Sequence, residues 1–364
     1  ETYEANRQIC KYVHSTSRGH EAIQLATAFH LKSQDWVSPY YRDESLLLGL
    51  GWTPYELMLQ LLTKRDDPFT GGRSYYSHPN SKDDDKPKII HQSSATGMQA
   101  IPTTGIAQGI QYLETIRKSS LVDEGVIKNE ETISNEESVI RDENDSTEFS
   151  ANEVDELLHV DTVPVEVLPV VVCSLGDASI TEGEVSEALQ FAALKQLPII
   201  YLVQDNAWGI SVSAEEGRAM TAYRYAKGFK GLKRARVDGT DFFKSYKTMQ
   251  KVIADVREKR RPWLVHAKVC LLNHHTSGVR KEFYRTEEDL AKHAERDPLP
   301  KFRNAIVADF GEEYLQQIEE EVRQEIKDSF EKAVASPEPD PAKVEEHVFV
   351  PTPVIEEKGE RMPA

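Results

Sequence analysis

The chain has 364 residues, of which 39% are hydrophobic and 29% charged, and its formal net charge is −17. A chain of this length can build a sizeable core as one large domain or two ordinary ones. The longest apolar runs, 169–175 and 197–203, are of strand length and fall short of the roughly 20 apolar residues that span a membrane, so we expect no membrane partner. Because the chain is acidic and has no basic stripe, we also expect no nucleic-acid partner.

The negative charge is concentrated in one segment. Residues 119–163 hold fourteen Asp and Glu against Lys128 and Arg141, a net of −12, which leaves −5 for the rest of the chain. A segment with few aromatic residues and high net charge cannot bury enough apolar surface to order itself. We therefore expect a disordered acidic insert, which is either a solvated loop or a segment that docks a partner.

Outside this insert, strand-like runs alternate with helical patterns. The runs 170–175 and 199–203 predict strands, and residues 182–196 between them predict a helix, in which Val185, Leu189, Ala192 and Leu194 are expected to lie near one face. This order makes a βαβ unit and indicates an α/β fold with a mostly parallel central sheet, flanked by helices on both faces.

The remaining elements follow the same plan. Residues 263–269 predict a further strand, and 312–335 predict a long helix. The tail 337–364 contains SPEPDP and VPTPV, a composition typical of an extended linker. We therefore expect a main domain over 1–336 and a Pro-rich C-terminal tail or linker over 337–364.

Polar residues follow the first two predicted strands. Asp177 lies at the end of one strand, and Asn206 lies 29 positions later at the end of the next. Because parallel strands end at the same sheet edge, we expect the two side chains to meet there. Their oxygens suit Mg²⁺, and Gly176 and Ala178 beside a helix N-terminus would let a diphosphate approach backbone amides. Such spacing also arises by chance.

Three cysteines, Cys10, Cys173 and Cys270, lie far apart in the sequence. Two of them fall in apolar strand-like runs, where a buried, reduced thiol is expected. The cysteines therefore favour a reducing compartment. We expect the bacterial cytoplasm, with the mitochondrial matrix as the alternative.

Several segments of the chain, including the one that holds Asp177 and Asn206, resemble a known protein family. The segment GDASITEGEVSEALQFAALKQLPIIYLVQDNAWGIS resembles the thiamin diphosphate signature, in the version found in alpha subunits of 2-oxo acid dehydrogenases. Matches in the same order include SRGHEAIQLATAFHL, DWVSPYYRDESLLLGLG, GGRSYYSHP, HQSSATGMQAIPTTGIAQG, RVDGTD and HHTSGVRKEFYR. The resemblance covers nearly the whole chain outside the acidic insert. It is closest to the branched-chain, 2-oxoisovalerate type, because of HHTS and the DPLPKFR segment after it. It implies the thiamin diphosphate-binding fold.

The resemblance also implies roles for individual residues. It implies that the metal ligands for Mg²⁺ are Asp177, Asn206 and the carbonyl of Trp208, and that His275 is the catalytic residue lining the channel, with His274 pointing elsewhere. The cofactor-binding residues that it implies are Tyr41, Arg42, Ser94, Thr96, Gly176, Asp177, Ala178, Ser179, Asn206 and His275. Arg42 would pair with the diphosphate, a role that suits its planar fork.

Each of these residues has a plainer interpretation. Without the resemblance, Arg42 would be expected in a surface ion pair with Asp43 or Glu44, and His275 would be an ordinary solvated loop histidine. Residues 94–97 would be a polar turn before a helix. Tyr284 and Arg285 match the end of a regulatory loop in the family, or otherwise belong to an ion pair at a helix start.

Two residues depart from the family pattern. Ala178 stands where the signature usually has glycine, and Gln204 stands where branched-chain members carry an arginine aimed at the diphosphate. Both substitutions are expected to weaken cofactor affinity. The acidic insert is also unusual, since the family has a short connection there.

The implied activity is oxidative decarboxylation of a branched-chain 2-oxo acid, with transfer of the acyl group to the lipoyl domain of a dihydrolipoyl acyltransferase. The glutamate that activates the cofactor belongs to the beta subunit in this family, so the implied partner is a beta subunit, or a beta domain fused after the tail. A pyruvate or acetoin dehydrogenase alpha subunit is the alternative within the class. A non-catalytic scaffold with the same fold is the alternative of another class, and the chain is too short for a self-sufficient thiamin enzyme.

Overall fold

The computed structural model describes residues 9–10, 14–81, 83–90, 95–123 and 168–344. It contains a six-stranded sheet in the order β2-β1-β3-β4-β8-β7, in which each neighbouring pair is parallel. The strands of this sheet are β1 (Trp36–Ser38), β2 (Lys88–Ile89), β3 (Val171–Gly176), β4 (Ile199–Asp205), β7 (Lys233–Asp238) and β8 (Trp263–Lys268). The predicted parallel α/β fold is therefore confirmed.

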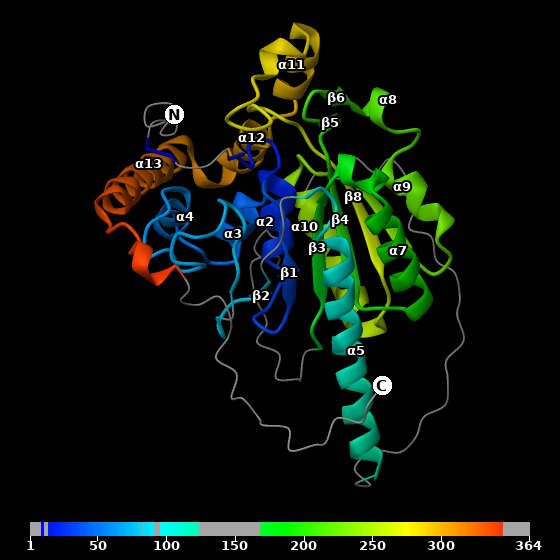
Figure 1. Cartoon of the computed structure of the whole chain (residues 1–364). Helices are drawn as coiled ribbons and strands as arrows, with labels where there is room; N and C mark the ends of the chain where they lie inside the picture. Colours follow the sequence, from blue (N-terminus) through cyan, green and yellow to red (C-terminus); the bar gives the residue numbers. More distant parts are fainter. Residues whose placement is uncertain (1–8, 11–13, 82, 91–94, 124–167, 345–364) are drawn as a thin grey trace.

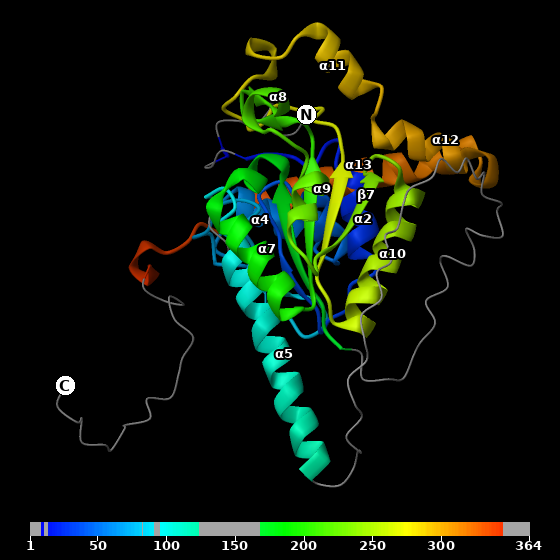
Figure 2. The same cartoon turned by 90° about the vertical axis from the view of Figure 1, so that its right-hand side faces the viewer.

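Helices cover both faces of this sheet (Figure 1, Figure 2). On one face, α5 (Ala100–Asp123), α7 (Gly183–Lys195) and α9 (Ala222–Tyr225) pack on Cys173, Tyr201 and their strand neighbours of the same parity. On the other face, α2 (Glu21–Ala28) and α10 (Phe242–Lys259) pack on the alternate residues, such as Val172 and Leu202. Because successive strand residues point to opposite faces, the apolar runs supply both layers of the core.

The helix α7 shows how burial selects a helix face. Val185, Leu189 and Ala192 are fully buried against the sheet, as expected from their spacing. The fourth predicted member, Leu194, is 73% exposed, so its assignment to this face was wrong. At 100° per residue, Leu194 lies on the side of the helix opposite Val185. Ala188 fills the inner face instead.

A smaller helical unit packs beside β1 and β2 and contains α3 (Glu44–Gly49), α4 (Pro54–Leu61) and α13 (Glu312–Ala335). The bounds predicted for the long C-terminal helix agree with α13. The first part of the tail, up to residue 344, contacts this unit: the Arg65 amide donates to the Pro337 carbonyl at 2.9 Å, and Lys64 Nζ lies 2.8 Å from Glu338 Oε1. The rest of the tail lies outside the described residues, and the domain boundary at 336 stays a prediction.

The other elements connect these layers. They are the two-stranded ribbon β5 (Trp208–Gly209) and β6 (Val212–Ser213), the helices α8 (Ala214–Gly217), α11 (Glu287–Ala294) and α12 (Pro298–Phe310), and the 3-10 turns η1 (Asp177–Thr181), η2 (Ala226–Gly228), η3 (Lys281–Phe283) and η4 (Pro341–Lys343). The helix α5 continues through Asp123, so the start predicted for the acidic insert, at 119, falls inside a helix. Residues 124–163, the rest of the predicted insert, lie outside the described residues. No helix in the described ranges is long and apolar enough to cross a membrane.

Candidate active site

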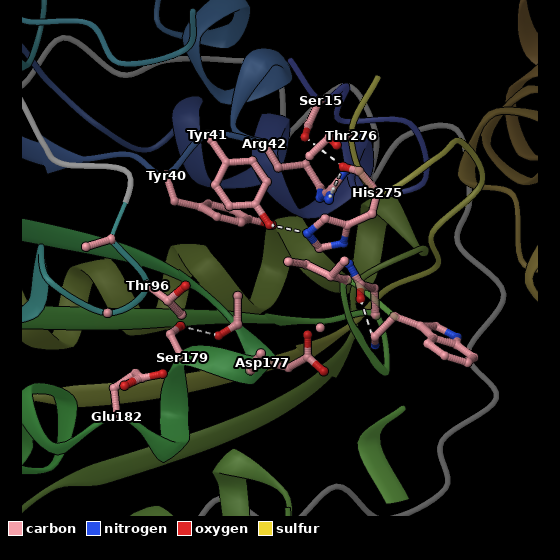
Figure 3. Close-up of a pocket in the computed structure, with 18 of the residues that line it drawn as sticks. Ser15, Tyr40, Tyr41, Arg42, Thr96, Asp177, Ser179, Glu182, His275 and Thr276 are labelled. Atoms are coloured by element: carbon pink, nitrogen blue, oxygen red, sulfur yellow. Dashed lines mark hydrogen bonds between the residues drawn. The ribbon is translucent and has the colours of Figure 1, made fainter. Parts of the chain in front are cut away.

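A cavity of about 610 Å³ lies at the carboxyl ends of β3 and β4. The loops that line it come from distant parts of the sequence: the turn after β1, the segment before α5, the loops after β3 and β4, and the loop near His275. The predicted site residues that line it are Tyr41, Arg42, Thr96, Gly176, Asp177, Ala178, Ser179, Asn206, Trp208 and His275. The remaining one, Ser94, lies outside the described residues. The expected position of the site, at the sheet edge where the strands end, is thus observed (Figure 3).

The loop after β3 begins as a tight turn. Asp177 starts the 3-10 turn η1, and the Ser179 hydroxyl donates a short hydrogen bond to the Gly176 carbonyl. The Asp177 carboxylate is 4% exposed and receives Arg218 Nη2 at 2.7 Å. Burial, followed by the charge of Asp205, raises the pKa of Asp177 to about 8. Arg218 offsets only part of this cost, so a further positive charge at Asp177 would be stabilising.

Asn206 directly follows β4, and both the nitrogen and the oxygen of its side-chain amide form hydrogen bonds. Its Nδ2 donates to His20 Nε2 at 3.2 Å, and its Oδ1 accepts from the Trp208 amide at 3.0 Å. Burial, followed by the charge of Arg42, lowers the pKa of His20 to about 3, so the imidazole is neutral. Its Nδ1 donates to Gln204 Oε1 at 2.9 Å, which leaves Nε2 as the acceptor. The amide of Asn206 is therefore fixed with its oxygen on the Trp208 side.

Gln204 does not reach the cavity. It is fully buried, and its Nε2 donates to Asp43 Oδ1 at 2.7 Å and to Ser174 Oγ at 2.9 Å, while its Oε1 lies 2.9 Å from His20 Nδ1. It is absent from the residues that line the cavity. Gln204 thus supports His20, which holds Asn206, and does not face the position where a ligand would bind.

Arg42 is buried at 1% exposure, so the surface ion pair with Asp43 or Glu44 was the wrong interpretation. Its Nη1 donates to the Thr16 carbonyl at 3.2 Å and its Nη2 to the His275 carbonyl at 3.0 Å. These bonds tie the Tyr41 turn to the loop of His275. The Nε of Arg42 is buried, and none of the residues described by the structure accepts a hydrogen bond from it.

His275 is also buried, at 6% exposure, so the solvated-loop interpretation was wrong for this residue. Its Nε2 lies 3.0 Å from the Tyr41 hydroxyl, and its Nδ1 is buried and has no hydrogen-bond partner in the part of the chain that the structure describes. Burial, followed by the charge of Arg42, lowers the pKa of His275 to about 3, which keeps the imidazole neutral. His274 does not line the cavity and lies near Glu282, as expected.

Two cavity positions have strict space requirements. Gly97 has φ +79°, and a Cβ there would lie 3.1 Å from the side chains of Glu182 and Val185. A Cβ on Gly209 would lie 2.9 Å from the Ala178 methyl, which stands where the signature usually has glycine. The methyl of Ala178 thus fits because the facing residue is a glycine.

The loop after β8 carries two further contacts to the site. Arg285 pairs with Asp289 four residues later, at the start of α11, as the plainer interpretation proposed. Its guanidinium also lies 5.6 Å from the centroid of the Trp208 ring, and Tyr284 packs edge-on against the same ring at 5.4 Å. This loop therefore supports Trp208 from outside the cavity.

The residues present fit a magnesium diphosphate. The donors Asp177, Asn206 and the Trp208 carbonyl are the hard oxygen ligands that Mg²⁺ prefers, and Asp177 already faces a cationic group. On the anion side, Arg42 Nε, Arg218 Nη1 and His275 Nδ1 are buried nitrogens with no hydrogen-bond partner among the described residues, and all three residues line the cavity. A group with several acceptor oxygens would satisfy such donors. No cluster of three or more His, Cys, Asp or Glu side chains suited to a metal occurs among the described residues.

The sequence reasoning missed Arg218, Asp205 and His20. Asp205 directly precedes Asn206, so its place at the strand end was readable. Arg218 lies 41 positions after Asp177 in an irregular loop, and nothing in the local pattern distinguishes it from the other arginines of the chain. His20 lies in the SRGHEAIQ segment of the resemblance, but only the fold places it beside Asn206.

Fold and cavity together define an α/β protein with a cavity at the carboxyl edge of a parallel sheet, where ligands of such folds usually bind. The family model of the dehydrogenase E1 component matches residues 2–154 and 165–342. The chain therefore belongs to the dehydrogenase E1 component family, whose members depend on thiamin diphosphate, and the resemblance to alpha subunits of 2-oxo acid dehydrogenases is confirmed.

Individual relatives differ in substrate. The chain is 34% identical over 137 residues to the 3-methyl-2-oxobutanoate dehydrogenase subunit alpha of Mycobacterium tuberculosis, covering 38% of this chain and 37% of the relative. It is 28% identical over 179 residues to the pyruvate dehydrogenase E1 component subunit alpha of Rickettsia bellii, covering 48% and 54%. The match to the 2-oxoisovalerate dehydrogenase subunit alpha of Bacillus subtilis is 24% identical over 283 residues, covering 78% and 69%. The matches to the first two span between about a third and about half of those relatives.

Proposed function

We propose that the chain is the alpha part of a thiamin-diphosphate-dependent 2-oxo acid dehydrogenase that acts on a branched-chain 2-oxo acid of the 2-oxoisovalerate type. One observation carries the proposal: the predicted cofactor and metal residues, which come from five separate segments, meet on a single cavity wherever the structure describes them. Chance placement of polar residues would scatter them over the surface. Family membership supplies the reaction class.

In this proposal the chain binds and orients the cofactor. Asp177, Asn206 and the Trp208 carbonyl would hold Mg²⁺, whose charge would neutralise part of the diphosphate. Arg42 would donate to the diphosphate through its Nε, for which the described residues offer no hydrogen-bond partner. When bound, thiamin diphosphate supplies the nucleophilic carbon and the electron sink for decarboxylation. Residues Thr96 and Gly97 border the cavity at its other side and would support the organic ring.

His275 is the proposed catalytic residue. Its neutral ring, held by the Tyr41 hydroxyl, presents one nitrogen that has no protein partner. A neutral imidazole in a buried site can donate a hydrogen bond to charge that develops on a substrate oxygen, without the desolvation cost of an imidazolium. Tyr41 fixes the ring orientation, which makes it a positioning residue for His275.

We further propose a beta subunit or beta domain as the partner that completes the site, since in the family pattern the cofactor-activating glutamate comes from beta. The lipoyl domain of a dihydrolipoyl acyltransferase would receive the acyl group. The bacterial relatives favour the cytoplasm as the compartment. Whether the beta part is fused after the tail stays a prediction.

Pyruvate is the second candidate substrate, because relatives named for pyruvate match the chain over a longer span than the mycobacterial branched-chain relative. The branched-chain assignment is supported by the HHTS and DPLPKFR segments. A non-catalytic scaffold is disfavoured by the intact Arg42, Asp177, Asn206 and His275.

Calorimetric titration of thiamin diphosphate with Mg²⁺ into the chain, with and without a beta partner, tests the proposal. We expect tight binding only with beta present, and its loss in Asp177→Ala. The reconstituted pair, assayed with an artificial electron acceptor, should turn over 2-oxoisovalerate faster than pyruvate. Absence of binding under both conditions would refute the enzymatic function and favour the scaffold, and faster turnover of pyruvate would refute the branched-chain assignment alone.

A further inference from the structure

Arg218 occupies an unusual place for a pocket arginine. Its Nη2 lies 2.7 Å from Asp177 Oδ2 and 2.8 Å from Asp205 Oδ1, so one guanidinium nitrogen serves two carboxylates. The three side chains are 7%, 4% and 9% exposed. This is a buried cluster of two acids and one arginine, and charge pairs of this kind interact strongly because water screens them little.

The two carboxylates are held unequally. Asp205 has other donors: His266 Nε2 lies 2.7 Å from its Oδ2, and the Ala207 amide donates to its Oδ1 at 3.0 Å. The ion pair of Asp177 is with Arg218. If Arg218 moves, Asp205 therefore still has hydrogen-bond donors. When Arg218 leaves Asp177, its guanidinium can stay paired with Asp205.

The backbone that carries Arg218 lies outside the hydrophobic core clusters. Arg218 directly follows α8, a four-residue helix with no buried residue, which is capped by Ser213 and lies beyond the carboxyl ends of the strands (Figure 1). The peptide at Arg218 is extended, with φ −156° and ψ 139°. A rotation of this side chain or a small shift of α8 disturbs no core contact.

We propose that Arg218 is a built-in competitor of the metal ion: its guanidinium holds Asp177 while the metal is absent, and a divalent cation must displace it to Asp205 before Asp177 can act as a ligand. The inference rests on the proposed function, because it takes Asp177 as a metal ligand. A divalent cation and a guanidinium on the same carboxylate oxygen would repel each other at close range. Arg218 thus weakens the binding of a metal ion without a diphosphate. A metal ion that binds together with a diphosphate is less affected, because the negative charge of the diphosphate offsets the charge of Arg218.

The test measures Mn²⁺ binding to the full chain without thiamin diphosphate, by electron paramagnetic resonance of the free ion. We expect Arg218→Gln to bind Mn²⁺ at least about tenfold more tightly than the wild type, since a competing charge has been removed. The matched control is Arg224→Gln, which removes the same charge from an exposed position six residues away on α9. The control should bind Mn²⁺ within about twofold of the wild type, a difference that a remote and screened charge produces.

A second measurement separates the inference from the proposed function. Magnesium-dependent binding of thiamin diphosphate to the wild type with its beta partner reports on the proposed function alone. If that binding is present but Arg218→Gln, folded by near-ultraviolet circular dichroism, binds Mn²⁺ no better than the wild type, the competition is disproved while the function stands. If neither Mn²⁺ nor the cofactor binds, both fail. If Arg218→Gln and Arg224→Gln raise the affinity for Mn²⁺ equally, the inference is also overturned, because the change would then come only from the lower net positive charge.

Discussion

The Tyr41 hydroxyl lies 3.0 Å from Nε2 of His275, although the two residues are 234 positions apart in the sequence (Figure 3). Arg42 reinforces this contact from the next position, because its Nη2 donates to the His275 carbonyl. The turn after β1 thus fixes both the ring and the backbone of the proposed catalytic histidine.

Tyr41→Phe removes the hydroxyl that orients this ring. Because the change leaves the metal ligands and Arg42 in place, we expect turnover with the beta partner to fall about tenfold, while the Kd for thiamin diphosphate changes less than about threefold. Steady-state kinetics and calorimetry on the same samples measure the two effects. Tyr314→Phe, at a half-exposed position on α13, serves as the control. An equal loss of affinity and turnover would show that Tyr41 binds the cofactor and does not position His275.

Asn206 should be required for metal-dependent binding. Asn206→Ala removes the side-chain oxygen and also the amide that donates to His20, so we expect the magnesium-dependent affinity for thiamin diphosphate to fall between about 10-fold and 100-fold. Asn206→Asp keeps an oxygen ligand and should lose less. Titrations at several Mg²⁺ concentrations would separate the loss of metal from a general loss of fold. Equal losses in both variants would argue that the contact with His20, and not the oxygen, carries the effect.

Arg42→Lys keeps the charge but not the planar fork. The lysine cannot reach the Thr16 and His275 carbonyls together, so buried acceptors lose their donors and we expect unfolding free energy to fall by about 1–3 kcal/mol. Urea unfolding followed by circular dichroism measures this change. Arg224→Lys, on the exposed surface, should lie within about 0.5 kcal/mol of the wild type. Unchanged stability in Arg42→Lys would mean that the two carbonyls find other donors.

His293 gives a pH dependence away from the site. Its Nδ1 accepts from the Leu271 amide at 2.8 Å, so the imidazole must stay neutral, and burial followed by the charge of Arg285 lowers its pKa to about 4. The unfolded chain takes up this proton near pH 6.5, so the stability from His293 is present above that pH and is lost as the pH falls towards 4.

The comparison with His293→Gln isolates this contribution. The stability advantage of the wild type over the variant should shrink by up to about 2 kcal/mol between pH 7 and pH 5, the value that follows from one group with these pKa values. Chemical denaturation of both proteins at the two pH values measures it. An advantage that stays constant with pH would show that His293 is protonated in the folded protein.

The sequence by itself determined the strands β3, β4 and β8, the βαβ unit and the position of the proposed ligands, but not the strands β1, β2 and β7. These features depend on local sequence, because the spacing of apolar residues along a short segment distinguishes a strand from a helix. The carboxyl ends of successive parallel strands also lie at the same edge of the sheet. Asp177 and Asn206 could therefore be placed together before any coordinates were known. A local error, at Leu194, came from assigning a residue to a helix face without following the 100° rotation per residue.

Only the tertiary structure decided the electrostatics of the site. Gln204 stands where branched-chain members of the family carry an arginine aimed at the diphosphate, and the fold buries it among His20, Asp43 and Ser174. Arg218 was not distinguishable in the sequence, and the fold brings it onto Asp177 and Asp205. Contacts of this kind depend on the path of loops between elements, and loop paths are set by packing against distant segments. Periodicity carries no information about such packing, which is why the sequence located the site but not its charge partners.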